Sequence, residues 1–182
     1  MIIGKGDIAK ILENLDRGDV TFFASGVSDS KETSEKEFER EEELLKKQPL
    51  HIHLVYISTL SLFYVKEQTP YLIHKKKMEA LIKSMFKSYT IVRIGNINWG
   101  NNPNTLINYL KSCIKNNTPF AVQQTYRHII DLEEFLYWMN LIRIGETEEM
   151  NIPGKMVWVP DLVKQLVQNE QSIPVPFMKS AE

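Results

Sequence analysis

The sequence has little cysteine, no excess of either charge and no long apolar run. Cys113 is the only cysteine among 182 residues, which excludes an internal disulfide framework and argues against a cysteine-based zinc site. Lysine and arginine number 22 and aspartate and glutamate 23, so no basic field points to nucleic acid. No apolar run reaches the roughly 18 residues of a membrane helix, and no signal peptide is visible. We therefore expect a cytoplasmic protein that binds neither membrane nor nucleic acid.

Strands and helices alternate along the chain. The length and a hydrophobic content of 43% suit one well-cored unit. Apolar β-rich runs predict strands, and apolar residues at helical spacing predict helices between them. The predicted strands are 1–3, 20–24, 53–57, 89–94 and 156–159; the predicted helices are 8–15, 34–47, 71–84, 104–114, 131–139 and 161–167. This alternation predicts an α/β fold with right-handed crossovers and a mainly parallel sheet, in which ligands bind beyond the carboxyl ends of the strands.

The first strand leads into a glycine-rich turn. Gly4-Lys5-Gly6-Asp7-Ile8-Ala9 fits G-x-G-x-x-A between a strand and a helix, where glycines allow a pyrophosphate to approach the backbone. A plain turn between strand and helix would use glycine too, so the motif alone is weak. Asp7 also competes with a phosphate for the positive end of the helix dipole.

A tyrosine and a lysine four residues apart begin the helix at 71–84. Tyr71 and Lys75 share one helix face, and an ammonium beside a phenol would lower the pKa of the phenol towards the range useful for acid–base catalysis. Thr59 ends the preceding strand, so its hydroxyl could share a substrate oxygen with Tyr71. A tyrosine and a lysine at this spacing often occur by chance. The catalytic interpretation is supported by the order of the glycine turn, the strand end at Thr59 and this pair along the chain.

The combined motifs resemble the extended short-chain dehydrogenases/reductases, the NAD-dependent epimerases, dehydratases and reductases of sugar nucleotides. Five segments carry the resemblance, and a sixth, weaker one adds to it. They are the glycine turn, 19–28 beside the nicotinamide, 56–63 with the catalytic hydroxyl, 70–75 with tyrosine and lysine, Arg93-Ile-Gly-Asn96-Ile-Asn-Trp-Gly100, and 127–131.

The resemblance implies a Rossmann-like fold and a set of roles. Residues 1–116 would form the dinucleotide-binding portion and 117–182 a small substrate-binding portion. Tyr71 would be the acid/base, Lys75 its activator and ribose ligand, and Thr59 would position the substrate oxygen. The implied NAD or NADP site comprises Gly4, Gly6, Ala24, Ser25, Gly26, Tyr71 and Lys75, and the implied nucleotide-sugar site comprises Asn96, Trp99 and Arg127. Core packing is an equally good interpretation of Trp99.

The chain also departs from the family. About a dozen residues separate Ala9 from the strand at Val20, where relatives fit further strands and the residue that reads the adenosine ribose. The two residues after Thr59, Leu60 and Ser61, lack the acidic pair typical of dehydratases, which favours reduction or epimerisation. The alternative is a catalytically idle relative that binds a nucleotide-sugar or serves as an assembly scaffold.

Further expectations concern partners and surfaces. By resemblance, two copies would pair through the helices near 34–47 and 71–86, and the setting would be polysaccharide or deoxysugar synthesis. The charges of the first of these helices predict a solvated face. His74 is expected in solvent, and none of the histidines or Cys113 has the spacing of metal ligands, so no metal is expected.

Overall fold

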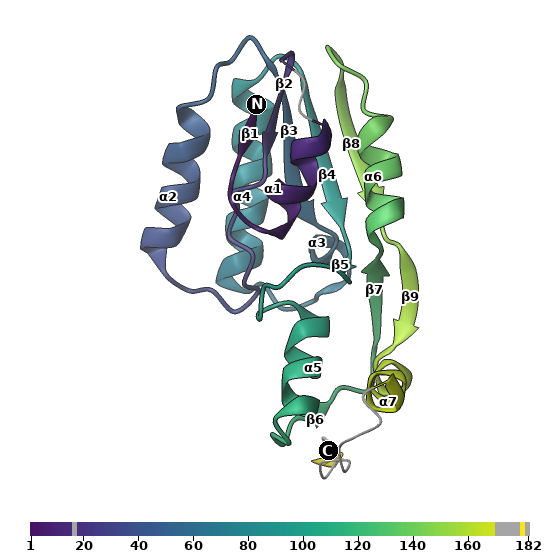
Figure 1. The fold of residues 1–182 in the computed structure, drawn as a ribbon. Helices are drawn as coiled ribbons and strands as arrows, with labels where there is room; N and C mark the ends of the chain where they lie inside the picture. Colours follow the sequence, from purple (N-terminus) through teal and green to yellow (C-terminus); the bar gives the residue numbers. More distant parts are fainter. Residues whose placement is uncertain (16–17, 170–178, 181–182) are drawn as a thin grey trace.

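A five-stranded parallel sheet forms the centre of the protein (Figure 1). The computed structural model describes residues 1–15, 18–169 and 179–180. The strand order is β1-β2-β3-β4-β8, and every neighbouring pair is parallel. These strands are β1 (Ile2–Ile3), β2 (Val20–Phe23), β3 (His53–Thr59), β4 (Tyr89–Ile94) and β8 (Thr147–Ile152). The predicted Rossmann-like α/β class is confirmed.

Helices cover both faces of this sheet (Figure 1). On one face, α1 (Asp7–Leu12), the 3₁₀ turn η1 (Glu13–Leu15) and α6 (Leu132–Asn140) enclose a core that includes Leu12, Val55 and Phe135. On the other face, α2 (Glu35–Lys46) and α4 (Pro70–Met85) enclose a second core that includes Leu45 and Met78. The central strands are buried on both sides, which is why their sequences read as continuous apolar runs.

A smaller unit extends from the carboxyl end of the sheet. It contains α5 (Leu106–Lys115), α7 (Val159–Asn169) and a three-stranded sheet in the order β5-β7-β9, with bounds Asn96–Ile97, Tyr126–Ile130 and Lys155–Trp158. The two-residue strands β6 (Ala121–Val122) and β10 (Lys179–Ser180) pair beside it, and α3 (Ser61–Tyr64) follows β3. The apolar faces of α5 and α7 share a third core.

The division at residue 116 does not follow these layers. α5, which precedes residue 116, packs against α7, whereas β8 and α6 return to the main sheet. β8 is not among the predicted strands because its sequence, Thr-Glu-Glu-Met-Asn-Ile, is polar, as an edge strand allows. Its exposure alternates along its length, so only one side is covered.

Helix starts agree in part with the prediction. Asp131 caps α6 as expected, since its Oδ1 accepts a hydrogen bond from the Glu134 N–H at 2.8 Å. α5 is capped by Thr105 rather than Asn104, and α7 begins at Val159 rather than after Asp161. Within the described residues no helix combines the length and apolar character needed to span a bilayer.

Candidate active site

A cleft of about 410 Å³ lies where the strands β1 to β4 end. Its walls combine the turn before α1, the loop after β2, the ends of β3 and β4, the first turns of α4 and the start of α5. The volume falls within the range of small-ligand sites, about 300–1,000 Å³. The wall includes residues 5–8, 24–28, 57–59 and 94–97 together with Arg40, Tyr64, Tyr71, Lys75 and Asn102. It is the site that the strand-end rule predicts.

The glycine turn forms one end of the cleft. Gly4 has φ +138°, and a Cβ at this position would lie 2.5 Å from the Ala24 carbonyl oxygen, so the turn packs directly on the end of β2. Gly6 precedes α1 and would meet nothing within 4 Å, which leaves room for a ligand close to its backbone. Gly6 and Ala24 line the cleft, and Gly4 supports the turn from behind.

The carboxylate of Asp7 is hydrogen-bonded to the loop before α5. Its Oδ2 accepts hydrogen bonds from the backbone N–H groups of Asn101 and Asn102 at 2.9 and 2.8 Å. Gly100 has φ +84°, and a Cβ there would overlap the Asp7 carboxyl group. Asp7 therefore fastens the loop before α5 to the start of α1.

Thr59 and Tyr71 lie together in the wall of the cleft. Thr59 ends β3, and Tyr71 stands in the first turn of α4, whose N-cap Thr69 accepts from the Leu72 N–H at 3.3 Å. Burial raises the pKa of Tyr71 well above its usual value, and a hydrogen bond with Thr59 offsets only part of that rise. The phenol is therefore protonated at physiological pH.

Lys75 forms an ion pair with a buried carboxylate on a different helix, Glu41 of α2. Its Nζ donates to Glu41 Oε1 at 3.1 Å and to the Tyr56 hydroxyl at 3.0 Å. The Nζ lies 5.9 Å from the centre of the Tyr71 ring. Burial lowers the pKa of Lys75, and the nearby Glu41 opposes this change. The expectation that Lys75 lowers the pKa of Tyr71 is wrong, because the ammonium is paired with Glu41 instead.

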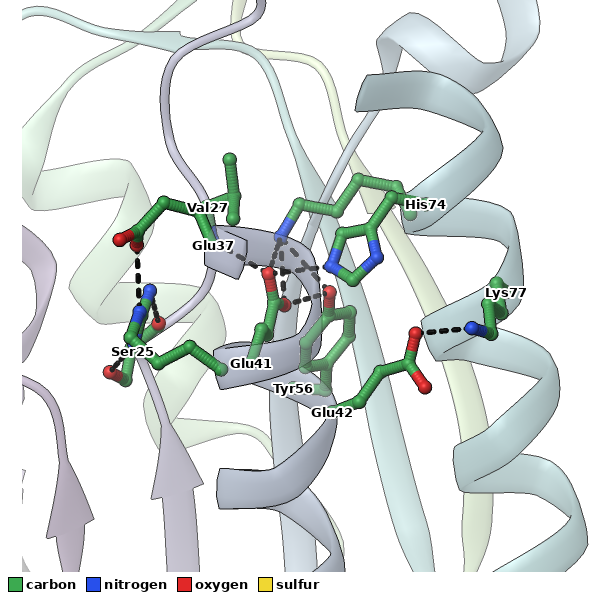
Figure 2. A network of polar contacts seen from close by, with 10 residues as sticks. Ser25, Val27, Glu37, Glu41, Glu42, Tyr56, His74 and Lys77 are labelled. Carbon is green, nitrogen blue, oxygen red and sulfur yellow. Dashed lines mark hydrogen bonds and ion pairs between the residues drawn. The ribbon is translucent and has the colours of Figure 1, made fainter. Parts of the chain in front are cut away.

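Glu41 is the centre of this network (Figure 2). It also accepts hydrogen bonds from the Val27 N–H and the Tyr56 hydroxyl, both at 2.7 Å, and its Oε2 lies 3.0 Å from His74 Nε2. Burial alone would raise the pKa of this carboxyl group. The Lys75 charge and the hydrogen bonds outweigh burial and lower the pKa to about 2.

Neither Glu41 nor His74 was expected to be buried. The side chain of Glu41 is 0% exposed and that of His74 is 3% exposed, whereas the charges of α2 predict a solvated face and His74 was placed in solvent. One signal could have found Glu41: the spacing Phe38, Glu41 and Leu45 puts it on the apolar stripe of α2. A carboxylate on such a stripe requires a partner.

The other predicted residues divide between the cleft and its surroundings. Ser25, Gly26 and Asn96 line the cleft, and Asn96 Nδ2 donates to the His128 carbonyl oxygen at 3.0 Å. Trp99 is not in the wall: its ring packs on Phe135, with centroids 5.3 Å apart, in the core beneath α1 and α6. The interpretation of Trp99 as a core residue is therefore the correct one.

Arg127 is also outside the cleft wall. Its Nη2 donates to Gln123 Oε1 at 2.7 Å on the exposed side of β7. The alternation of a strand places Arg127 and the buried Ile130 on opposite faces. Arg127 thus stands outside the cleft wall, and the phosphate contact implied by the resemblance stays a prediction.

Three solved structures have a fold similar to that of this chain. A dTDP-glucose 4,6-dehydratase from Bacillus anthracis with NAD matches with a TM-score of 0.66 and 16% identity, over 96% of this chain and 64% of its own. The Bordetella bronchiseptica enzyme WbmG with NAD and UDP matches with a TM-score of 0.63 and 15% identity, over 90% and 60%. A dTDP-4-dehydrorhamnose reductase from Bacillus anthracis with NADP matches with a TM-score of 0.62 and 16% identity, over 94% and 69%.

The chain has the fold of the extended short-chain dehydrogenases/reductases. The resemblance inferred from the motifs is confirmed at the level of fold. No known protein family and no curated protein matches the sequence. The chain spans only 60% to 64% of the length of WbmG and of the dehydratase.

β1 is the edge strand of the main sheet and pairs only with β2 within the described residues. The turn before α1 and the loop after β2 line the cleft, and their residues could hold a phosphate-bearing ligand.

Proposed function

We propose that the protein is an NAD(P)-dependent reductase or epimerase that acts on a nucleotide-linked sugar. The observation that carries the proposal is the placement of Thr59 and Tyr71 together in a cleft that begins at a glycine-rich turn. The proposal is supported by neighbours of the same fold whose structures contain NAD with UDP, or NADP. In this assignment Gly4, Gly6, Ala24, Ser25 and Gly26 shape the cofactor site.

Tyr71 and Thr59 would act on one substrate oxygen. The bound cofactor supplies or removes the hydride at the sugar carbon. In the direction of reduction, Tyr71 would give its phenolic proton to the carbonyl oxygen of the substrate, and the tyrosinate would regain a proton from solvent. Thr59 positions the oxygen, and Asn96 contacts the nucleotide-sugar. The raised pKa of Tyr71 does not separate reduction from epimerisation, because both reactions require the phenol to exchange its proton with a substrate oxygen.

The second candidate is a catalytically idle relative that binds a nucleotide-sugar or serves in assembly. Two observations favour it. Lys75 is paired with Glu41 rather than available to a ribose, and β1 forms the edge of the main sheet, where relatives are expected to continue it. A lone nucleotide could still occupy the cleft.

Fluorescence titration with NADH and NADPH tests the proposal. We expect at least one of the two to bind. If neither NADH nor NADPH binds at millimolar concentration, the enzyme assignment is wrong and the idle relative remains.

Turnover is tested next, with a panel of UDP- and dTDP-linked 4-keto sugars and the loss of NADH absorbance. Tyr71→Phe should reduce the rate by roughly 10²–10⁴-fold. Tyr137→Phe is the matched control, since Tyr137 is 60% exposed and lies on α6, outside the cleft wall. Equal rates for Tyr71→Phe and wild type would refute the assigned role.

We also propose that two copies pair through α2 and α4. The two helices lie on the same face of the sheet (Figure 1). Ile73 on the outer side of α4 is 55% exposed, whereas Glu42 of α2 forms one ion pair with Lys46 of the same helix and another with Lys77 of α4. The mixed surface would make this pairing weaker than one through a wide apolar stripe.

A further inference from the structure

We propose that Glu41 is a positioning residue that withholds the Lys75 ammonium from Tyr71 and from a ligand in the cleft. The tyrosine and lysine are in the register of a catalytic pair, but the lysine is committed to a carboxylate from α2. The inference concerns Lys75 and Tyr71 themselves, and it holds whether or not the proposed reaction is correct.

The contacts of the ammonium carry the first step. An ammonium has three N–H donors, and those of Lys75 reach Glu41 Oε1 at 3.1 Å, Glu41 Oε2 at 3.5 Å and the Tyr56 hydroxyl at 3.0 Å. The side chains of Lys75 and Glu41 are 3% and 0% exposed. The positive charge is therefore compensated inside the protein before any ligand arrives.

The carboxylate is fixed from several elements (Figure 2). The Val27 N–H fixes it from the loop after β2, Tyr56 from β3 and His74 from α4. The ring of His74 is stacked on Phe38 of α2, with centroids 4.5 Å apart. Because these partners come from different elements, the carboxylate cannot turn with the lysine towards the cleft without breaking several hydrogen bonds.

The loop after β2 closes over the pair. A Cβ on Gly26 would lie 2.6 Å from Lys75 Nζ and 2.9 Å from Glu41 Oε1. Gly26 and Lys75 both line the cleft. The missing side chain at Gly26 thus allows the ion pair to form directly beside the backbone of this loop.

The charged and titratable neighbours of Tyr71 agree with this arrangement. Those that act on its pKa by charge are Glu41, Tyr64 and Asp29, and all of them raise it. Two further charges act on the pKa of Lys75: Glu79 raises it and Arg40 lowers it. Tyr71 therefore keeps its proton at physiological pH.

Tyrosine labelled with carbon-13 at Cζ provides a test without cofactor or substrate, because the Cζ shift reports ionisation of each phenol. The Tyr71 signal is assigned by its loss in Tyr71→Phe. In Glu41→Gln the lysine is released, and we expect the pKa of Tyr71 to fall by about 1–3 units, as an opposite charge within about 4–6 Å produces. Glu37→Gln is the matched control, one turn earlier on α2 with its carboxylate exposed, and should leave Tyr71 unchanged.

The double variant Glu41→Gln/Lys75→Met separates the two causes. Both variants lose the Glu41 charge, which itself raises the pKa of Tyr71, but only Glu41→Gln retains the released ammonium. The proposal therefore expects the pKa of Tyr71 to fall by about 1 unit or more further in Glu41→Gln than in the double variant. A fall of the same size in both variants comes from loss of the Glu41 charge alone and overturns the proposal. A rise in the double variant means that Lys75 already activates Tyr71 in the wild type, which also overturns it.

The double variant keeps the test decisive if Glu41→Gln fails to fold, because replacing both members of a buried ion pair is far better tolerated than replacing one. The experiment is also separate from the test of function. Failure to bind NADH would refute the proposed reaction and leave the titration of Tyr71 as it is.

Discussion

Replacement of Glu41 by glutamine should change how the protein responds to acid. The network lowers the pKa of Glu41 from 4.5 to about 2, and the carboxylate is fully buried. At about 1.4 kcal/mol per unit, this fall corresponds to about 3 kcal/mol of folding stability. The carboxylate has a lower pKa in the folded state than in the unfolded state. Its contribution is therefore complete above pH 4.5 and is lost as the pH falls towards 2.

The assay is urea unfolding followed by circular dichroism at about pH 6 and about pH 3. Between these values the wild type should lose about 2 kcal/mol through Glu41, most of the total, because the unfolded form takes up its proton first. Glu41→Gln should lack this loss. At the higher pH it should be less stable than wild type by about 3–5 kcal/mol, since Lys75 is left without its partner.

Other carboxylates also titrate in this range, so the difference between variant and wild type isolates Glu41. Glu37→Gln removes a carboxylate from the same helix that is 43% exposed, and it should follow the wild-type acid response. If Glu41→Gln loses as much stability in acid as wild type, the ion pair is not formed in solution. Equal stability of variant and wild type at neutral pH would lead to the same conclusion.

Three further predictions concern the turn, a helix start and the assembly. Gly4→Ala should cost about 1–3 kcal/mol in urea unfolding, because φ is +138° and the new Cβ would meet the Ala24 carbonyl; Gly6→Ala, with open space, should unfold close to wild type. Thr69→Ala should cost about 1 kcal/mol by removing the cap of α4, whereas Ser34→Ala should be nearly neutral because Ser34 makes no side-chain cap bond. Sedimentation at increasing concentration should show a dimer, and a monomer throughout would rule out pairing through α2 and α4.

Most strands of the main sheet were predictable, because strands buried on both faces of a parallel sheet have continuous apolar sequences. Val20–Phe23, His53–Thr59 and Tyr89–Ile94 were all expected within a few residues. Thr147–Ile152 was not, since an edge strand with one covered side needs no apolar run. Its place beside β4 is set by contacts far along the chain, and local sequence does not encode them.

The position of Tyr71 beside Thr59 was also predictable, since the carboxyl ends of parallel strands meet at one edge. Arg127 was not, because a resemblance of sequence order does not say which face of β7 a residue occupies. The alternation along β7 places Arg127 outside the cleft. The match of residues 127–131 to a family motif thus predicted where the segment lies but not the direction in which the Arg127 side chain points.

Lys75 shows why spacing alone could not give the chemistry of the site. Four residues of helix place its Cα on the face of Tyr71, but its ammonium stands at the end of a flexible stem and goes to the strongest acceptor within reach. That acceptor, Glu41, lies 34 residues earlier in the chain, and only the packing of α2 beside α4 brings the two together. The sequence does predict that Glu41 is paired, because a glutamate on the apolar stripe between Phe38 and Leu45 is buried and requires a positively charged partner. The sequence does not predict which residue this partner is, since the packing of α2 against α4 decides whether Lys75 or another cation of α4 contacts the carboxylate.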